Sequence, residues 1–246
     1  DESLYKGAKP VLWSVVEKTA LADAEVEYED HTSNTIYVKF LIHTAPDKDL
    51  EGANIVIWTT TPWTIPGNRA LAFGSDLTYS LIEVEKVSEN SLVKVGDKLI
   101  FAEELISTVS EEIGIATFKN LKTFSGSNLA DCFCEHPFKN LGYDFDVRPF
   151  HGDFVNLEQG TGIVHIAPGH GDDDYNLGIK NGVDIVQTVQ DDGRYNHHAK
   201  GFENEHIYKV DDKIAEKLKE FSKLLFKGTL RHSYPHSWRS KAPLIY

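Results

Sequence analysis

Residues 58–70 read Trp58-Thr59-Thr60-Thr61-Pro62-Trp63-Thr64-Ile65-Pro66-Gly67-Asn68-Arg69-Ala70, and the rest of the chain is organised around them. The apolar runs 54–57 and 71–73 flank this stretch, which predicts a strand, a stiff loop and a second strand. Each of its two prolines fixes one φ angle and removes one backbone donor, so the loop has few conformations. A rigid strip of threonine hydroxyls, tryptophan faces and one amide suits a ribose and a base. The same residues are also good strand and turn formers, which is the simpler interpretation.

The composition is that of a globular protein. The chain has 246 residues, of which 41% are hydrophobic. It contains no apolar run of the roughly 18 residues that a membrane-spanning helix needs, and its first residues show no secretory signal pattern. Methionine is absent, so we expect a piece of a longer protein. Cys132 and Cys134 supply neither a disulfide framework nor a zinc ligand set, and we expect reduced thiols in a cytoplasmic protein.

The charge is acidic and unevenly distributed. A formal net charge of -13 argues against a surface that wraps a long nucleic-acid backbone. It is compatible with a site that holds the last one or two nucleotides of a strand. The basic residues concentrate in the last fifth of the chain, where they form either a solvated helix face or a surface that faces RNA. They are Lys200, Lys209, Lys213, Lys217, Lys219, Lys223, Lys227, Arg231, Arg239 and Lys241.

Short strands dominate the predicted secondary structure. We expect one helix with Asp97 as its cap and Gly114 at its end, and a last helix from Asp211 or Asp212 to Gly228. Many closely spaced strands with two helices predict an α+β, β-rich fold, in which a strongly curved or closed β-barrel-like sheet carries peripheral helices. The segments expected to be extended are 35–42, 54–60, 70–73, 77–84, 115–123, 141–150, 163–166 and 183–189.

A second informative stretch reads Gly160-Thr161-Gly162-Ile163-Val164-His165-Ile166-Ala167-Pro168-Gly169-His170-Gly171-Asp172-Asp173-Asp174-Tyr175. It predicts a short apolar strand, a break, and a loop or helix N-terminus where carboxylates are favoured. His165, His170 and the aspartates 172–174 are a possible transition-metal ligand set. Alternatively, one histidine and one aspartate line a pocket for an aminoacyl group. A capped helix preceded by a core histidine is the third interpretation.

Both stretches resemble motifs of isoleucyl-tRNA synthetases. Residues 58–70 are similar to the threonine-rich peptide of their editing domain, and residues 160–175 are similar to the second motif of that domain. The additional acidic residue Asp172 differs from the commoner pattern of the second motif. The resemblance covers nearly the whole chain. It implies a single editing (connective peptide) domain over residues 1–246. Segments 1–30 and 229–246 would then connect it to an absent catalytic core of a bacterial-type enzyme.

The resemblance also implies roles for single residues. Asp174 would contact the free α-amino group of the aminoacyl moiety, and His165 would line the side-chain pocket. The three threonines would shape the site around the terminal adenosine and the ester, and Asn68 would help to orient it. The implied catalytic residues are Asp174, His165, Thr60 and Thr61; the implied substrate-binding residues are Thr59, Thr60, Thr61, Trp63, Asn68, His165 and Asp174; no metal ligand is implied.

The expected function is hydrolytic proofreading of isoleucine tRNA mischarged with valine, with valyl-adenylate as a second candidate substrate. The expected partners are the 3′ end of that tRNA and the rest of the parent synthetase, with no membrane. The resemblance implies no cofactor in this domain, with ATP and magnesium used by the absent catalytic domain of the parent enzyme. A non-catalytic module for the tRNA 3′ end and a metal-dependent hydrolase are the alternatives. The proofreading interpretation requires the two motifs to meet as walls of a single dry cavity.

Overall fold

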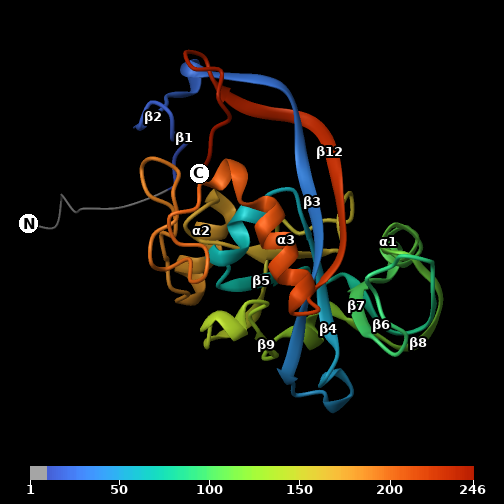
Figure 1. Cartoon of the computed structure of the whole chain (residues 1–246). Coiled ribbons are helices and arrows are strands. Elements are labelled where there is room, and N and C mark those ends of the chain that lie inside the picture. The colour runs from blue at the N-terminus through green and yellow to red at the C-terminus, as the bar shows by residue number, and fades with distance from the viewer. Residues whose placement is uncertain (1–9) are drawn as a thin grey trace, which may run out of the picture.

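The structure is a computed structural model that describes residues 10–246, and its main element is a mixed sheet of ten strands (Figure 1). Residues 1–9 of the expected connecting segment 1–30 lie outside the described residues. The strands are β3 (Val26–Thr44), β4 (Asn54–Thr59), β5 (Ala70–Phe73), β6 (Thr78–Val87), β7 (Lys98–Ala102), β8 (Ile115–Ser125), β9 (Phe133–Glu135), β10 (Asp146–His151), β11 (Ile163–Ile166) and β12 (Leu224–Ser237). Outside the sheet lie the hairpin of β1 (Trp13–Ser14) and β2 (Thr19–Ala20) and the helices α1 (Ile106–Ile113), α2 (Asp172–Asn181) and α3 (Asp211–Glu220).

The sheet is open, so the expectation of a closed or strongly curved barrel-like sheet was wrong. Its strands follow the order β11-β5-β10-β9-β3-β4-β7-β6-β8, and β12 pairs with β3 beside this path. Closure into a barrel requires the first and last strands to pair. Here β11 pairs only with β5, and β8 only with β6, among the strands of residues 10–246. The short strands β5, β10 and β11 fall within segments that were expected to be extended, whereas β9 was not expected, and the order of the strands in the sheet was not visible in the sequence.

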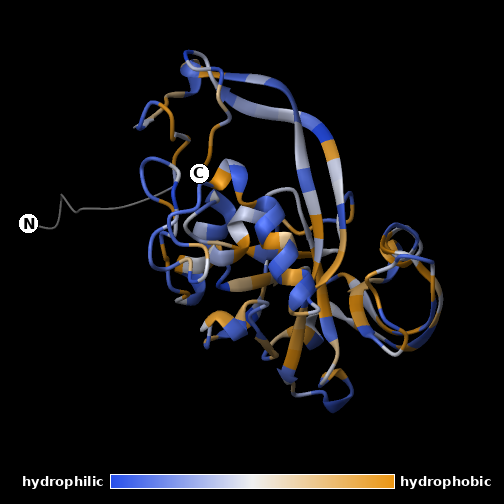
Figure 2. Cartoon of the chain, viewed as in Figure 1, coloured by the Kyte–Doolittle hydropathy of each residue, from blue (hydrophilic) through white to orange (hydrophobic). Residues whose placement is uncertain are grey.

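A long ribbon of β3 and β12 rises from the body of the molecule (Figure 1). The two strands pair antiparallel from Leu224 opposite Val38 to Ser237 opposite Val26. Orange, the hydrophobic colour of Figure 2, is concentrated in the strands of the body, whereas the upper part of the ribbon is mostly blue and white. The ribbon therefore includes parts of both segments that were expected to be connections, and it forms a regular structure there.

The strands β6, β7 and β8 and helix α1 form a lobe beside the body (Figure 1). The helix predicted from Asp97 starts only at Ile106, because residues 98–102, of which 99–102 are buried, form strand β7 and pair with β6. Its end at Gly114 is confirmed, since that residue adopts the left-handed conformation with φ 79° that glycine tolerates best. No helix in residues 10–246 has the length and apolarity to cross a bilayer.

Three other boundaries differ from the predictions. Helix α3 starts at Asp211 as expected but ends at Glu220, and the chain then enters β12, whose pairing with β3 satisfies the backbone. The predicted strand 183–189 contributes only an isolated bridge at Val189. The predicted strand 141–150 is restricted to β10, because a tight turn around Gly142 precedes it.

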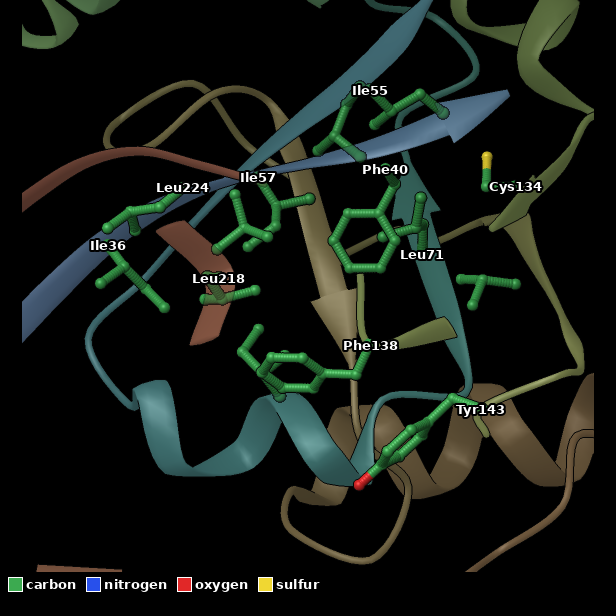
Figure 3. Close-up of a cluster of buried hydrophobic side chains, with 14 of the residues drawn as sticks. Ile36, Phe40, Ile55, Ile57, Leu71, Cys134, Phe138, Tyr143, Leu218 and Leu224 are labelled. Carbon is green, nitrogen blue, oxygen red and sulfur yellow. The ribbon is translucent and has the colours of Figure 1, made fainter. Parts of the chain in front are cut away.

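The core of the body lies between the sheet and the segments that cover it. Figure 3 shows Phe40, Ile57 and Leu71 from the strands together with Phe138 and with Leu218 of α3. Leu218 is fully buried in this cluster. Because burial of a leucine side chain is worth about 1.5–3 kcal/mol, α3 contributes directly to the stability of the sheet that carries the site.

Leu218→Ala is expected to lower the free energy of unfolding by about 2–5 kcal/mol, because it removes buried methyl groups and leaves a cavity. Urea unfolding followed by circular dichroism measures this change. Lys219→Ala on the exposed face of the same helix is the matched control and should change stability by less than about 0.5 kcal/mol. Equal losses in the two variants would show that α3 does not pack as described.

Candidate active site

The threonine-rich stretch forms a short, buried turn between two strands, as its prolines suggest. Strand β4 ends at Thr59, and residues Pro62–Gly67 form a 3-10 turn before β5 begins at Ala70. All six residues of that turn are buried. The hydroxyl of Tyr195 donates to the Trp63 carbonyl oxygen, which fixes the turn from the far side of the core. The expected strand, stiff loop and second strand are therefore confirmed.

The threonine hydroxyls form a connected chain along this turn. The Oγ1 atoms of Thr59 and Thr61 lie 3.2 Å apart, and those of Thr61 and Thr64 lie 3.3 Å apart. The Thr64 hydroxyl donates to the Thr61 carbonyl oxygen over 2.8 Å. These contacts restrict the rotation of the hydroxyls, and the bond to the Thr61 carbonyl oxygen fixes the orientation of the Thr64 hydroxyl.

His165 joins this chain to the second motif. Strand β11 pairs antiparallel with β5 and places His165 opposite Leu71, directly after the turn. The Nε2 atom of His165 lies 2.7 Å from the Thr64 hydroxyl oxygen, and its Nδ1 atom lies 3.1 Å from Nδ2 of Asn68. The two motifs, about a hundred residues apart in the sequence, therefore meet at one imidazole ring.

The hydrogen bonds fix the tautomer of His165. The amide nitrogen of Asn68 also donates to the Ala70 carbonyl oxygen over 2.8 Å, so the amide cannot be turned around without placing two acceptors together. Nδ1 of His165 must then be an acceptor, and Nε2 carries the proton that it donates to Thr64. This assignment is consistent because Thr64 passes its own proton to Thr61.

His165 is held in its neutral form. It is only 7% exposed, and burial lowers its pKa to about 3, with a smaller contribution from His170. A buried imidazolium would be costly without a carboxylate partner. The ring is therefore neutral and held in place, with a defined hydrogen-bond polarity at both nitrogens.

Asp174 lies in the first turn of α2, close to His165 along the chain. Its Oδ2 atom accepts a hydrogen bond from the Ala167 amide over 2.6 Å, which ties the helix to the end of β11. Burial raises the pKa of Asp174 to about 6, although the Ala167 hydrogen bond opposes this rise. Asp172 and Asp173 of the same turn are exposed. Asp174 is thus the partly buried carboxylate of the three, suited to receive a cation.

His170 is likewise held by hydrogen bonds at both ring nitrogens. Its Nδ1 atom lies 3.1 Å from the carbonyl oxygen of Tyr246, and its Nε2 atom lies 2.8 Å from the Thr188 hydroxyl. Its ring stands edge-on to Trp63 with the centroids 5.2 Å apart. Burial lowers the pKa of His170 to about 4. The Trp63–His170 contact is a second link between the motifs, and neither the spacing nor the composition of the sequence indicated it.

The donor set gives no support to the metal interpretation. His165 and His170 each have both ring nitrogens in hydrogen bonds to protein groups, so neither has a free lone pair to offer. Within residues 10–246, no three histidine, cysteine, aspartate or glutamate side chains converge as metal ligands.

Two cavities adjoin the motifs. Thr60, Thr61 and Trp63 line the first, which has a volume of about 330 Å³. His170 and residues of the segment 185–191 line the second, of about 260 Å³. Ile245 lines both cavities. The structure thus brings Asn68 and His165 into direct contact. The expectation of one shared cavity is not met by these two cavities, because Thr60 and Thr61 line the first and His170 lines the second. Neither His165 nor Asp174 is among the residues that line them.

Residues outside the two expected sets also belong to this region. Thr64 lies within the quoted motif, and its spacing of three residues from Thr61 in a turn was the available signal. Asn34 and Asp211 line the first cavity from β3 and α3. Asn34 precedes the predicted strand 35–42, and Asp211 was predicted only as a candidate helix cap.

His165 is predicted to stay neutral, with the proton on Nε2, down to about pH 4. Long-range nitrogen–proton correlation spectra read the tautomer directly, and His165→Gln assigns the signal. An unfolded histidine takes up a proton below about pH 6.5, whereas the folded ring resists it, so this group's contribution to stability is complete above that pH and declines as the pH falls. A protonated His165 at pH 5 would contradict the described packing.

Comparisons with known proteins place the chain in a family. Residues 1–235 match the model for class I tRNA synthetases (I, L, M and V). The chain is 51% identical to the isoleucine–tRNA ligase of Pelagibacter ubique and 46% identical to that of Gluconobacter oxydans, over 99% of its own length in each case. These alignments cover 26% and 27% of the two ligases, so the chain spans about a quarter of these relatives.

The fold also has a solved counterpart. A crystal structure described as GlLeuRS-CP1 matches 79% of this chain and 98% of its own, with a TM-score of 0.58 and 12% sequence identity. At that identity the likeness concerns the fold alone. Together with the family match over residues 1–235, the two motifs confirm the resemblance, and the chain belongs to the class I tRNA synthetase family, where it is similar throughout to a segment of isoleucine–tRNA ligases.

Proposed function

We propose that this chain is the proofreading domain of an isoleucyl-tRNA synthetase and hydrolyses isoleucine tRNA that carries valine. The observation that carries the proposal is the contact of Asn68 and Thr64 with the two nitrogens of His165, which joins the two motifs at one buried ring. The proposal is supported further by the similarity of the whole chain to isoleucine–tRNA ligases.

A second, hydrolytic site is needed because a single binding pocket discriminates poorly between isoleucine and the smaller valine. One methylene in a binding pocket is worth only about 1–3 kcal/mol, a general limit for which the isoleucine–valine pair is itself the standard illustration. A site that admits valine and excludes isoleucine removes the errors that this limit allows. The wall must be stiff to do so, because a wall that yields would accept the extra methylene at little cost.

His165 is suited to be that wall. Its ring cannot rotate without breaking the hydrogen bond to Thr64 or that to Asn68, and Asn68 is itself held by Ala70. It is neutral, so it presents an apolar face to an aliphatic side chain.

The reaction is ester hydrolysis. A water molecule adds to the carbonyl carbon of the ester, the bond to the ribose oxygen breaks, and valine leaves as the carboxylate. The ribose oxygen takes up a proton that the water releases. Asp174 anchors the α-ammonium group through a charge-assisted hydrogen bond. Thr60, Thr61 and backbone amides position the water and the developing oxyanion, with Thr59 as their support. A ribose hydroxyl of the substrate assists the water, and no side chain is assigned as general base.

The partners follow from the same proposal. The 3′ end of the charged isoleucine tRNA enters the site, valyl-adenylate is the second candidate substrate, and the body of the tRNA rests on other parts of the parent synthetase. The formal net charge of -13 agrees with a chain that binds only the 3′ end and leaves the body of the tRNA to other parts of the synthetase. Hydrolysis here needs no cofactor, and ATP and magnesium belong to the catalytic domain of the parent enzyme. The cytoplasm is the proposed location.

The deciding experiment measures release of labelled valine from valine-charged isoleucine tRNA, by this chain and by the full-length synthetase. Hydrolysis of the valyl ester faster than of the isoleucyl ester supports the proposal. Binding of the RNA end without turnover would support a non-catalytic module instead. Activity that a chelator abolishes and zinc or manganese restores would favour the metal-dependent hydrolase.

Asp174→Ala is predicted to lower kcat/KM for the valyl ester by at least about 30-fold, since loss of one partner of a buried charge pair costs about 2–5 kcal/mol. Asp173→Ala, an exposed neighbour in the same helical turn, is the matched control. In the unmodified protein kcat/KM should rise with pH through a step near 6, where Asp174 ionises. The step should vanish in Asp174→Asn, and its persistence there would rule out this role.

His165→Ala is predicted to enlarge the pocket and let isoleucyl-tRNA be hydrolysed, so that the ratio of valyl to isoleucyl hydrolysis falls by about 10-fold or more, the value of one methylene. Single-turnover deacylation of both esters measures this ratio. His151→Ala, at an exposed histidine on β10, is the control and should leave the ratio unchanged. Unaltered selectivity in His165→Ala would remove His165 from the side-chain pocket.

A further inference from the structure

Arg69 is the only charged residue in the stretch 58–70, and neither of the expected site sets includes it. Its main-chain amide donates to the Ile166 carbonyl oxygen over 2.9 Å. Ile166 follows His165 on β11 and is paired with Ala70 of β5. Arg69 therefore lies where the threonine-rich turn ends and the strand that carries His165 passes beside it.

The guanidinium group of Arg69 folds back onto the turn. Its Nη1 atom donates to the Asn68 carbonyl oxygen over 2.6 Å and to the Pro66 carbonyl oxygen over 3.3 Å. The last carbonyl groups of a helical turn have no partner within that turn, so a cationic donor is favourable there. Hydrogen bonds from an ionised donor are roughly twice as strong as those between neutral groups. Arg69 thus holds the main chain at the end of the turn.

A second contact keeps the guanidinium group of Arg69 in place. Its Cζ atom lies 4.6 Å from the ring centroid of Phe145, which is a cation–π contact. Burial lowers the pKa of Arg69, but the group stays protonated at neutral pH, because the ordinary pKa of arginine lies above about 12. The guanidinium group is therefore a charged donor that is held on one face by a ring and at one nitrogen by two carbonyl oxygens.

Asn68 is the residue through which these contacts reach the site. Arg69 binds its carbonyl oxygen, while its own side-chain Nδ2 lies 3.1 Å from Nδ1 of His165. The amide meets the imidazole ring only if the main chain from which it extends stays in place. A misplacement of about 1 Å can lower the rate of an enzyme about 100-fold even when it originates away from the reacting atoms. A single residue therefore separates the guanidinium contact from the His165 contact.

Arg148 offers a contrast within the same cavity. Both arginines line a third cavity, of about 270 Å³, at the C-terminal end of α2. The guanidinium group of Arg148 also lies over aromatic rings, those of Phe133 and Phe150. Its Nη2 atom, however, donates to the exposed Asp131 rather than to the turn. The two arginines thus have similar surroundings and differ in what they hold.

We propose that Arg69 is a positioning residue of the hydrolytic site, which through the Asn68 carbonyl oxygen holds the amide that orients His165. The inference rests on the proposed function, and it adds a residue that contacts no substrate. A loosened His165 ring would still leave room for valine but would exclude isoleucine less well. Loss of the Arg69 contacts should therefore reduce selectivity more than it reduces the rate on the valyl ester.

Arg69→Met tests this role in single-turnover deacylation, because methionine keeps an apolar side chain against Phe145 but offers no donor. The ratio of valyl to isoleucyl hydrolysis should fall about 3- to 10-fold, with the valyl rate within about threefold of the unmodified value. Arg148→Met is the matched control and should leave the ratio unchanged. An unchanged ratio in Arg69→Met, or an equal fall in Arg148→Met, would overturn the proposal.

Arg69→Lys separates the charged donor from simple packing, and it serves as the test if the methionine variant does not fold. Lysine keeps the positive charge and one donor nitrogen but not the planar fork, so its ratio should lie between those of the unmodified protein and Arg69→Met. A ratio as low as that of Arg69→Met, or a ratio equal to the unmodified one if only the lysine variant folds, would show that the contact with the turn is not the cause.

A double-variant cycle tests the route through Asn68. If Arg69 acts through Asn68, then Arg69→Met should cause no further fall in the ratio when Asn68→Ala is already present, because both changes loosen the same ring. Fully additive effects on the ratio would show that Arg69 acts by another path and would overturn the assignment.

Spectra of His165 separate this inference from the proposed function, because they need no ester. The nitrogen–proton correlations of the His165 ring should shift in Arg69→Met, whereas those of Arg148→Met should match the unmodified protein. A shifted signal in a chain that hydrolyses no ester would support the hold of Arg69 on His165 and refute the hydrolytic function alone. An unshifted signal in Arg69→Met would overturn the positioning role, whether or not hydrolysis is observed.

Discussion

The hydrogen-bonded chain Asn68–His165–Thr64 is the constraint on which the site depends. Each of its links uses up a donor or an acceptor, so none of the three side chains can turn independently of the others. The chain is also what joins the turn between β4 and β5 to β11, since strand pairing alone would leave the His165 ring free to choose a rotamer. Rigid positioning therefore comes from polar contacts in a place that excludes water, where such contacts are strongest.

Much of the site was predictable because its residues lie in two contiguous stretches. The strand on either side of the turn, the strand with His165 and the helix start at Asp174 all carry local signals. The contributions of Asn34 and Asp211 were not predictable, because they depend on the order of strands in the sheet. The prediction of a closed barrel was wrong for the same reason. Local sequence patterns identify strands, whereas closure of a sheet depends on whether its two edge strands pair with each other.

The charge pattern has a local explanation. Lys213, Lys217, Lys227 and Arg231, all from the basic C-terminal region, form ion pairs with nearby carboxylates. The basic region thus behaves mainly as a solvated face around α3 and β12. Exposed pairs of this kind contribute little to stability, and they leave the surface without a broad positive field. Such a surface agrees better with a site that binds the end of a nucleic-acid chain by shape and hydrogen bonds than with one that binds a long phosphate backbone.

Strand β3 has a mechanical role beyond pairing. It runs for 19 residues, and one part of it is a central strand of the core sheet while the other is an arm of the ribbon. At about 3.3 Å per residue such a strand extends some 60 Å. The inner half of β3 is hydrogen-bonded along both edges, to β4 on one and to β12 and β9 on the other. The ribbon therefore cannot swing without bending this strand, and it does not act as a free hinge. A displacement of its tip therefore acts on the base of the threonine-rich turn, because β4 is hydrogen-bonded to that same inner half of β3.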